Sequence, residues 1–403
     1  MISYIEARAL VAEQVGKRRR KAAMRTKPVN DALGDVLARE IRSDRDYPPF
    51  DRSTRDGYAV HANEAAVGVK LRSIGEIKAG DAVSEPLAPG TCIQIMTGAA
   101  VPPGADAVVM IEFTERNGDE VTFHRASSPG QNLVPRGSEA RMGDLALNSG
   151  LRLGYAELAV AAQVGAAEVC CFSRPRVAIL STGDEVVPII ETPGPFQIRN
   201  SNSVSLASQV RLAGGEPVPL GNALDRVDDL SAKVEQGLRE DILVLSGGVS
   251  MGKYDLVESV LKSLGAEFFF DAVAVRPGKP AVFGRRRDTF VFGLPGNPVS
   301  TMVTFQLFVT LAIDILGGAQ PRPLPFLEAS LAEPMHEKGG LTHFLPAHFD
   351  SREGSPQVRP LRWQGSGDIA TLTQANCFVV VPADRQDMAA GERVSVLPRP
   401  DVI

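Results

Sequence analysis

Residues 241–255 read DILVLSGGVSMGKYD, an apolar run that ends in a glycine-rich loop. The run from Asp241 to Leu245 has the length and composition of a buried strand, and Gly247 and Gly248 follow closely after it. Glycines in this place let the backbone approach a phosphate, and the N-terminus of a following helix adds a positive dipole end. We therefore predict a strand, a phosphate- or nucleotide-binding loop and a helix, with a purely structural turn as the alternative.

Strands and helices alternate on both sides of this stretch. Residues 176–180 and 290–294 are apolar enough for buried strands, and residues 202–212 and 256–264 have helical patterns. Alternation of this kind predicts a mostly parallel sheet with helices on both faces, and such sheets bind ligands at the carboxyl ends of their strands. We assign residues 175–319 to this α/β domain.

The rest of the chain predicts a multidomain protein of the α/β plus β class. Residues 46–139 alternate short β-branched runs with Pro/Gly turns, which is typical of a β-rich module. Residues 1–45 and 140–174 flank this module and predict a discontinuous helical and extended linker domain, with a helix through residues 31–37. Residues 320–403 open with a proline-rich segment and predict a small C-terminal β domain.

Composition narrows the classes of partner. The chain has 403 residues, with 43 Lys+Arg against 48 Asp+Glu and a net charge of −5, so no basic excess indicates nucleic-acid binding. Its four cysteines contain no C-x-x-C motif, which argues against a zinc knuckle or a disulfide framework. No secretory signal is visible, and the apolar stretch 299–316 contains Gln306 and Asp314, as a buried helix would. We expect a cytoplasmic protein without a membrane span.

The glycine loop nearly matches a P-loop. Gly247 is followed after four residues by Gly252 and Lys253, but Tyr254 stands where a Ser or Thr should ligate Mg²⁺. No apolar run ending in Asp follows at a suitable distance. A different phosphate or nucleotide loop is therefore the preferred interpretation.

Carboxylates follow three of the expected elements. Residues 181–185 (STGDE) end the strand 176–180 and include Glu185, Asp225 follows another expected strand, and Asp255 closes the glycine loop. If the strand order brings these ends together, the three carboxylates suit a hard cation that bridges phosphate oxygens. A plain turn that caps the strand is the alternative for residues 181–185.

Two proline-framed turns belong to the same domain. Residues 276–280 (RPGKP) hold Arg276 and Lys279 in a rigid frame suited to an oxyanion, and residues 294–300 (LPGNPVS) join a strand to a helix N-terminus. In the β-rich module, residues 48–60 and 95–99 are loops dense in polar side chains. Each of these loops could also be structural.

Together these motifs resemble the molybdopterin molybdenumtransferases, the MoeA family that includes the C-terminal domain of gephyrin. The resemblance covers nearly the whole chain and rests on six ordered motifs. They are FDRSTRDGYAV at 50–60, IMTGA at 95–99, STGDE at 181–185, SGGVSMG at 246–252, PGKP at 277–280 and GLPGNPVS at 293–300.

The resemblance implies an enzyme that inserts molybdenum from molybdate into adenylylated molybdopterin. It implies Mg²⁺-dependent hydrolysis of the adenylate and release of AMP. It further implies an elongated homodimer of four-domain subunits with a C-terminal β-barrel, an active site shared between subunits, and no membrane or nucleic-acid partner. A molybdopterin adenylyltransferase and molybdoenzyme apoproteins are the implied protein partners.

The family motifs also assign roles to residues of this chain. The implied catalytic carboxylates are Asp56, Glu185, Asp225 and Asp255, and the last three are the implied Mg²⁺ ligands. The implied ligand-binding residues are Thr97, Thr182, Gly183, Gly247, Gly248, Ser250, Arg276, Lys279, Pro295, Pro298 and Ser300.

Three positions depart from the family pattern. Glu139 stands where the family has an aspartate, Thr54–Arg55 replaces an Ala-Met-like pair, and residues 375–377 replace an Ala-Asp-Gly-like turn. The alternatives are therefore a tungstate-preferring or non-catalytic scaffolding paralogue of the same fold, and a P-loop-like nucleotide hydrolase. Tyr254 argues against the hydrolase, and the retained carboxylates with Lys279 favour catalysis over scaffolding.

Overall fold

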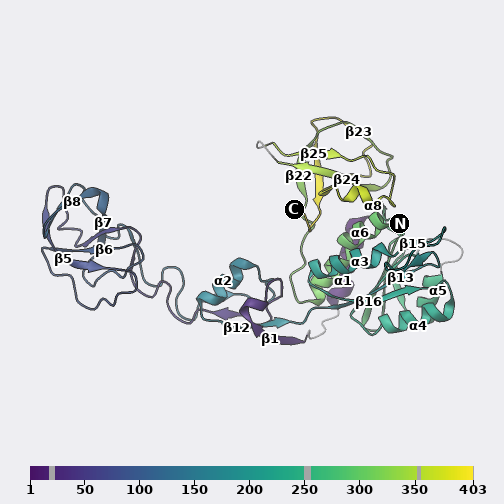
Figure 1. Cartoon of the computed structure of the whole chain (residues 1–403), viewed down its shortest axis with the longest axis horizontal. Helices are drawn as coiled ribbons and strands as arrows, with labels where there is room; N and C mark the ends of the chain where they lie inside the picture. Colours follow the sequence, from purple (N-terminus) through teal and green to yellow (C-terminus); the bar gives the residue numbers. More distant parts are fainter. Residues whose placement is uncertain (18–22, 249–255, 352–354, 403) are drawn as a thin grey trace.

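The chain is elongated and divides into four parts along its length (Figure 1). The computed structural model describes residues 1–17, 23–248, 256–351 and 355–402. The β-rich module lies at one end, a narrow linker region follows, and the α/β domain and the C-terminal β domain lie together at the other end (Figure 1).

A six-stranded, mostly parallel sheet forms the centre of the α/β domain. The order of its strands is β16 (Glu216–Ala223), β13 (Arg176–Thr182), β17 (Ile242–Ser246), β21 (Thr289–Leu294), β20 (Val282–Arg286) and β18 (Glu267–Phe270). The first four strands are parallel, whereas β20 runs antiparallel to both of its neighbours, β21 and β18. This arrangement confirms the predicted fold class.

Helices cover both faces of this sheet because alternate strand residues face opposite sides. Val177 and Val244 face a core with α1 (Tyr4–Lys17), α3 (Ser201–Ala213) and the long helix 298–316. Ala178 and Leu243 face a second core. This second core is completed by α4 (Val227–Gly237) and α5 (Leu256–Ser263).

The first helix lies in a different domain from the one expected. Ala7, Val11 and Val15 of α1 are fully buried in the α/β core. The expected assignment of all of residues 1–45 to the linker domain is therefore wrong for this helix. An apolar stripe along a helix shows that one face is buried, but it does not show against which domain.

The helix expected over residues 31–37 is also absent. The chain makes a short 3₁₀ turn, η1 (Val29–Asp31), and then reverses at Gly34, whose φ is 77°. That backbone conformation is incompatible with a continuing helix. Val36 and Leu37 instead form isolated bridges to two other segments.

The linker domain is built from short pairs of strands around a small core. Strand β1 (Met24–Pro28) pairs with β12 (Glu168–Phe172), and β2 (Ile41–Arg42) pairs with β11 (Leu145–Leu147). Helix α2 (Tyr155–Gln163) packs in the same core through Ala161.

The β-rich module contains its own six-stranded sheet. The order of its strands is β7 (Ala107–Met110), β4 (Gly57–Val60), β6 (Thr91–Ile95), β5 (Lys70–Ile77), β9 (Glu120–Phe123) and β8 (Thr114–Asn117). A short pair, β3 (Arg52–Ser53) and β10 (Leu133–Val134), lies beside it, and η2 (Ile111–Phe113) follows β7.

The C-terminal domain is a closed small β-barrel. Its strands are β24 (Thr342–Asp350), β25 (Gln357–Pro360), β22 (Leu327–Leu331), β28 (Arg393–Pro398) and β26 (Cys377–Val381), and pairing of β24 with β26 closes the ring. Strand β19 (Val275–Arg276) of the preceding domain pairs with β24. The pair β23 (Met335–His336) and β27 (Asp387–Met388) and helix α8 (Ile369–Leu372) complete the domain.

Among the residues that the structure describes, one helix is long and apolar enough to cross a membrane by length and composition. It spans Pro298–Leu316, and 78% of its apolar window is buried inside the protein. It runs as α6 (Pro298–Thr304), the π-helical η3 (Phe305–Val309) and α7 (Thr310–Leu316). Its side chains form the centre of the larger α/β core, as expected of a core helix.

Candidate functional site

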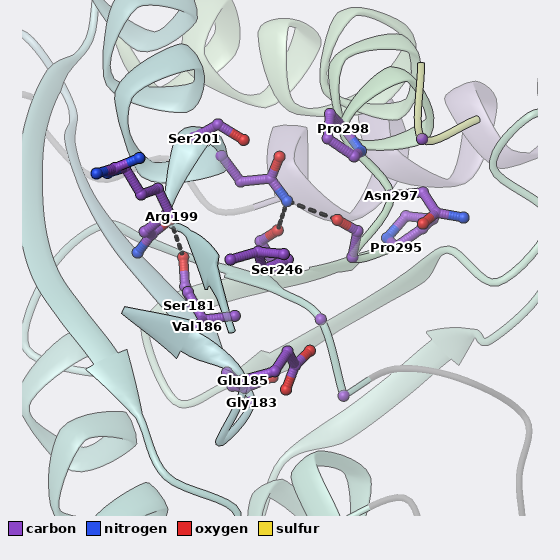
Figure 2. Close-up of a pocket in the computed structure, with 18 of the residues that line it drawn as sticks. Ser181, Gly183, Glu185, Val186, Arg199, Ser201, Ser246, Pro295, Asn297 and Pro298 are labelled. Carbon is purple, nitrogen blue, oxygen red and sulfur yellow. Dashed lines mark hydrogen bonds between the residues drawn. The ribbon is translucent and has the colours of Figure 1, made fainter. Parts of the chain in front are cut away.

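A cavity of about 670 Å³ opens at the carboxyl ends of β13, β17 and β21. Figure 2 shows Ser181, Glu185, Ser246, Pro295 and Pro298 around it. The residues that line it are Ser181, Thr182, Gly183, Glu185, Val186, Ile198, Arg199, Asn200, Ser201, Asn202, Asp225, Ser246, Gly247, Gly248, Pro280, Pro295, Gly296, Asn297, Pro298, Gly367 and Ile369. The structure thus joins four loops that the sequence treats as separate motifs.

Two glycines let the backbone form one wall of the cavity. Gly247 and Gly248 have φ values of 94° and 63°, which side chains rarely adopt. A Cβ atom on Gly247 would lie 2.9 Å from the carbonyl oxygen of Thr182, and one on Gly248 would lie 2.7 Å from Val257 Cγ2. Only glycine fits here, so the peptide groups of the loop border the cavity directly.

Two helix N-termini border the same cavity. Ser201 begins α3, whose cap is Asn200, and Pro298 begins α6 after Asn297. The positive end of the helix dipole makes each of these ends favourable for an anion, although in α6 Pro298 has no N–H and the N–H of Val299 donates to the carbonyl of Ser366 at 3.0 Å. Together with the glycine loop, they suit a ligand with several phosphate or other anionic oxygens.

Asn202 holds two of the loops together. Its Nδ2 donates to Ser246 Oγ at 2.8 Å and to the carbonyl oxygen of Gly296 at 2.7 Å, as the dashed lines in Figure 2 mark. The sequence analysis gave residues 202–212 only a helical pattern and assigned no binding role to Asn202. A usable signal was present, because these residues start a helix in a domain whose other strand-to-helix loops are predicted to bind the ligand.

Two buried oxygen atoms of the site have no hydrogen-bond partner within the described part of the chain. They are Thr182 Oγ1, which lies beneath the glycine loop, and Asn202 Oδ1. Leaving a buried acceptor unpaired costs about 1–3 kcal/mol, so such atoms require an explanation. A site whose polar groups are completed by a bound ligand supplies one.

Carboxylates gather at one edge of the cavity. Glu185 and Asp225 line it, and the backbone N–H of Asp225 donates to Asp184 Oδ1 at 3.0 Å. Partial burial, followed by the nearby charges of Asp184 and Glu185, raises the pKa of Asp225 above its ordinary value. Asp184, the other carboxylate of the 181–185 motif, therefore belongs to this cluster as well.

The predicted Mg²⁺ ligand set is only partly described. Asp255 and Ser250 lie outside the described residues, and no group of three potential ligands is found among those that are described. Glu185 and Asp225 remain as carboxylate oxygen ligands that line the same cavity as the glycine loop. Mg²⁺ is bound through one or two carboxylates, substrate phosphates and water, so this donor set fits the ion.

Within the described part of the α/β domain, three of the predicted ligand residues do not line the cavity. Lys279 is exposed and adjoins Pro280, which does line it. Arg276 is 3.7 Å from Glu337 Oε2, and Ser300 is buried within α6, where its carbonyl accepts from Thr304 Oγ1. The 276–280 loop therefore borders the cavity through one end only.

Asp56 and Thr97 form a separate pair in the β-rich module. Asp56 Oδ1 accepts from the backbone N–H of Thr97 at 2.7 Å and from its Oγ1 at 2.8 Å, which together hold the pKa of Asp56 below its ordinary value. Glu139 pairs with Arg52 at 2.7 Å in the same module. Within one chain this module lies at the far end from the cavity (Figure 1), so Asp56 is not brought to Glu185.

The fold and cavity define an α/β protein with a cavity suited to an anionic ligand at the strand ends of a mostly parallel sheet. Family models match three parts of the chain. They are the MoeA N-terminal region (domain I and II) at residues 2–165, a probable molybdopterin binding domain at 178–314 and the MoeA C-terminal region (domain IV) at 328–398.

Full-length relatives agree with these matches. The molybdopterin molybdenumtransferase of Bacillus subtilis is 34% identical over 380 residues, spanning 92% of this chain and 88% of the relative. That of Haemophilus influenzae is 32% identical over 374 residues, spanning 92% of both. A molybdopterin biosynthesis MoeA structure from Pyrococcus horikoshii superposes with a TM-score of 0.80 at 28% identity, covering 99% and 100% of the two chains. The chain belongs to the MoeA family of molybdopterin molybdenumtransferases.

Proposed function

We propose that this transferase of molybdenum cofactor biosynthesis inserts molybdenum from molybdate into adenylylated molybdopterin, with Mg²⁺-dependent hydrolysis of the adenylate and release of AMP. One observation carries the proposal. The glycine loop at Gly247, two helix N-termini and the carboxylates of Glu185 and Asp225 surround a single cavity of about 670 Å³. That volume lies in the range of cavities that hold small organic ligands.

The glycine loop at Gly247 and Gly248, together with the N-terminus of α3, would hold the phosphate groups of the adenylate. The N–H of Gly247 donates to the carbonyl of Leu294 at 3.1 Å, which fixes the loop, so the backbone of Gly248 and the start of α3 would face the ligand. Asn202 also ties Ser246 to Gly296, so these groups are held in place before the ligand arrives. Fixed donors stabilise the charge that develops on phosphate oxygens during hydrolysis. Glu185 and Asp225 would hold Mg²⁺, which neutralises phosphate charge when bound.

The molybdate dianion would bind at the 276–280 loop beside the cavity. Lys279 is exposed there, and Arg276 adds a second cation. None of the four cysteines, all of which are described, is among the residues that line the cavity. Burial raises the pKa of Cys92 and Cys377 to about 12, so these thiols stay protonated. The soft sulfur ligands that molybdenum prefers would therefore come from the pterin dithiolene.

A direct assay tests the proposal. Purified protein, adenylylated molybdopterin, molybdate and MgCl₂ should together release AMP, and omission of molybdate or Mg²⁺ should abolish that release. A parallel reaction with tungstate measures oxyanion preference. Binding of the adenylate without AMP release under any of these conditions would instead indicate a scaffolding paralogue.

The proposal includes a homodimer whose active site is shared between subunits. The motivating observation is that the Asp56–Thr97 pair lies far from the cavity in its own chain (Figure 1). A second subunit with twofold symmetry could bring its β-rich module to this cavity. An adenylyltransferase would supply the substrate, and molybdoenzyme apoproteins would accept the product.

A further inference from the structure

The loop that carries Arg276 and Lys279 is anchored in the C-terminal barrel. Strand β19 lies outside the α/β sheet and pairs in parallel with β24, with Arg276 opposite His343. The backbone N–H of Thr342 donates to the carbonyl of Ala274 at 3.0 Å. The N–H of Ala274 in turn donates to the carbonyl of Ile2 at 2.7 Å. Side chains of the barrel therefore lie directly beside this loop.

Three ionisable side chains meet at this junction. His343 is only 1% exposed, and its Nδ1 lies 3.0 Å from Glu337 Oε2. The same oxygen lies 3.7 Å from Nη1 of Arg276. Since a carboxylate accepts, His343 Nδ1–H is the donor. The buried imidazole of His343 and the guanidinium of Arg276 therefore both lie next to the same carboxylate oxygen of Glu337.

The backbone of Glu337 is fixed as well. Its N–H donates to the carbonyl of Gln386 at 2.8 Å, directly after the β23–β27 pair. His343 is part of β24, which is paired along most of its length with β26. Because its backbone is fixed and its carboxylate accepts from buried His343, the side chain of Glu337 has little conformational freedom, whatever the rotamer of Arg276.

We propose that Glu337, fixed by His343, is a positioning residue that holds Arg276 in the orientation that receives the oxyanion. This inference rests on the proposed binding of molybdate at the 276–280 loop. Arg276 is half-exposed, and a free arginine loses rotamer entropy when a ligand orders it. Pairing with Glu337 removes part of that cost before the oxyanion arrives.

Two roles for Glu337 predict opposite results. Acting only through its negative charge, Glu337 would repel a dianion, and its removal would tighten molybdate binding. Acting as a positioning residue, it aids binding, and its removal weakens binding. The sign of the change therefore separates the two roles without reference to its size.

Calorimetric titration of sodium molybdate into the full-length protein tests the proposal. Glu337→Gln should weaken molybdate binding by roughly three- to tenfold, the range expected when one long side chain must be ordered on binding. The affinity for AMP should stay within about twofold of wild type, since the proposed phosphate site is formed by other loops, at Gly248 and the start of α3. Glu333→Gln is the matched control, because Glu333 is an exposed barrel carboxylate that pairs with Arg359 at 3.4 Å. It should change neither affinity.

A double-mutant cycle separates positioning from a general loss of structure. In the Arg276→Ala background, Glu337→Gln should have no further effect on molybdate affinity, because the group it positions is gone. His343→Gln keeps a donor near the carboxylate and should fall between wild type and Glu337→Gln. Equal or tighter molybdate binding by Glu337→Gln, or additive effects in the cycle, would overturn the inference. Wild-type molybdate affinity in Arg276→Ala would overturn the assignment of the loop itself, and with it this inference.

Discussion

At the scale of single residues, Asp225 is held in an environment that disfavours its charge. Its pKa is raised by partial burial and by the carboxylates of Asp184 and Glu185. A raised folded-state pKa contributes stability only below the unfolded-state value, and this contribution is lost as the pH rises through the folded-state value. At pH 7 the ionised carboxylate is therefore a local cost that a bound cation would relieve.

Asp225→Asn should raise the melting temperature at pH 7 in EDTA, by about 1–2 °C for a surface change of this kind. The gain should disappear below about pH 4, where the wild-type carboxyl is protonated as well. With millimolar MgCl₂ the order should reverse, because only the wild type offers both carboxylates, and AMP release should fall at least tenfold in the mutant. Scanning calorimetry at pH 7 and below about pH 4 measures the melting temperatures of mutant and wild type. A lower melting temperature of the mutant in EDTA at pH 7 would contradict this account of Asp225.

Substitution of Gly248 tests whether the backbone of the glycine loop takes part in ligand binding. Gly248→Ala should cost about 1–3 kcal/mol of stability through its positive φ and should lose most of its AMP affinity, since the new Cβ would crowd Thr182 and Val257. Gly265→Ala is the matched control, because Gly265 has a φ of 80° but open space around it. It should show the backbone cost with unchanged AMP binding. Equal AMP affinity in both mutants would exclude a role of the Gly248 backbone in ligand binding.

At the scale of elements, one buried carboxylate joins the linker domain to the long helix. Asp314 of α7 is fully buried, and its Oδ1 lies 2.9 Å from Nη2 of Arg152 and 2.7 Å from Nη2 of Arg322. Arg152 also donates to the carbonyl of Gly34 at 2.7 Å. This ion cluster explains the acidic residue in an otherwise apolar helix.

Asp314→Ala should destabilise the protein by about 3–5 kcal/mol, because it leaves two arginines without their buried partner. The midpoint of guanidinium unfolding measures this loss. Glu328→Ala is the control, since the Glu328–Arg393 pair is largely exposed at 3.4 Å and should contribute less than about 1 kcal/mol. Similar midpoints for the two mutants would show that the buried cluster adds no more than a surface pair.

At the scale of the whole molecule, the β-rich module that contains Asp56 lies at the far end of the chain from the cavity (Figure 1), and the proposed homodimer predicts an active site shared between subunits. Chains with Asp56→Ala and chains with Glu185→Ala should each be inactive alone. When the two are mixed, denatured and refolded, random pairing should restore about a quarter of wild-type activity, because each heterodimer then has one site free of both defects. Activity that stays at the level of the single mutants, with heterodimers shown to be present, would refute a site shared in this way.

Much of the fold followed from local pattern. The strand–helix alternation over residues 175–319 depends on side-chain periodicity, which reports burial of one face and is confirmed by β13, β17 and β21. Two local predictions were wrong. The helix at 31–37 is excluded by the backbone at Gly34, and α1 packs in a domain other than the one expected. Periodicity identifies an apolar face but not the partner that covers it.

The candidate site divides in the same way. Residue types and spacing by themselves determined the family, because its motifs are short runs of consecutive residues. They also predicted a phosphate-binding loop at Gly247 and Gly248 and candidate ligands at Glu185 and Asp225, which line the cavity. Only the tertiary structure decided that these loops meet in one cavity, that Asn202 joins two of them and that Asp56 lies elsewhere. It also placed Glu337 and His343 beside Arg276. The reason is physical: strand order and register bring together residues separated by tens to hundreds of positions, and no local spacing encodes that order.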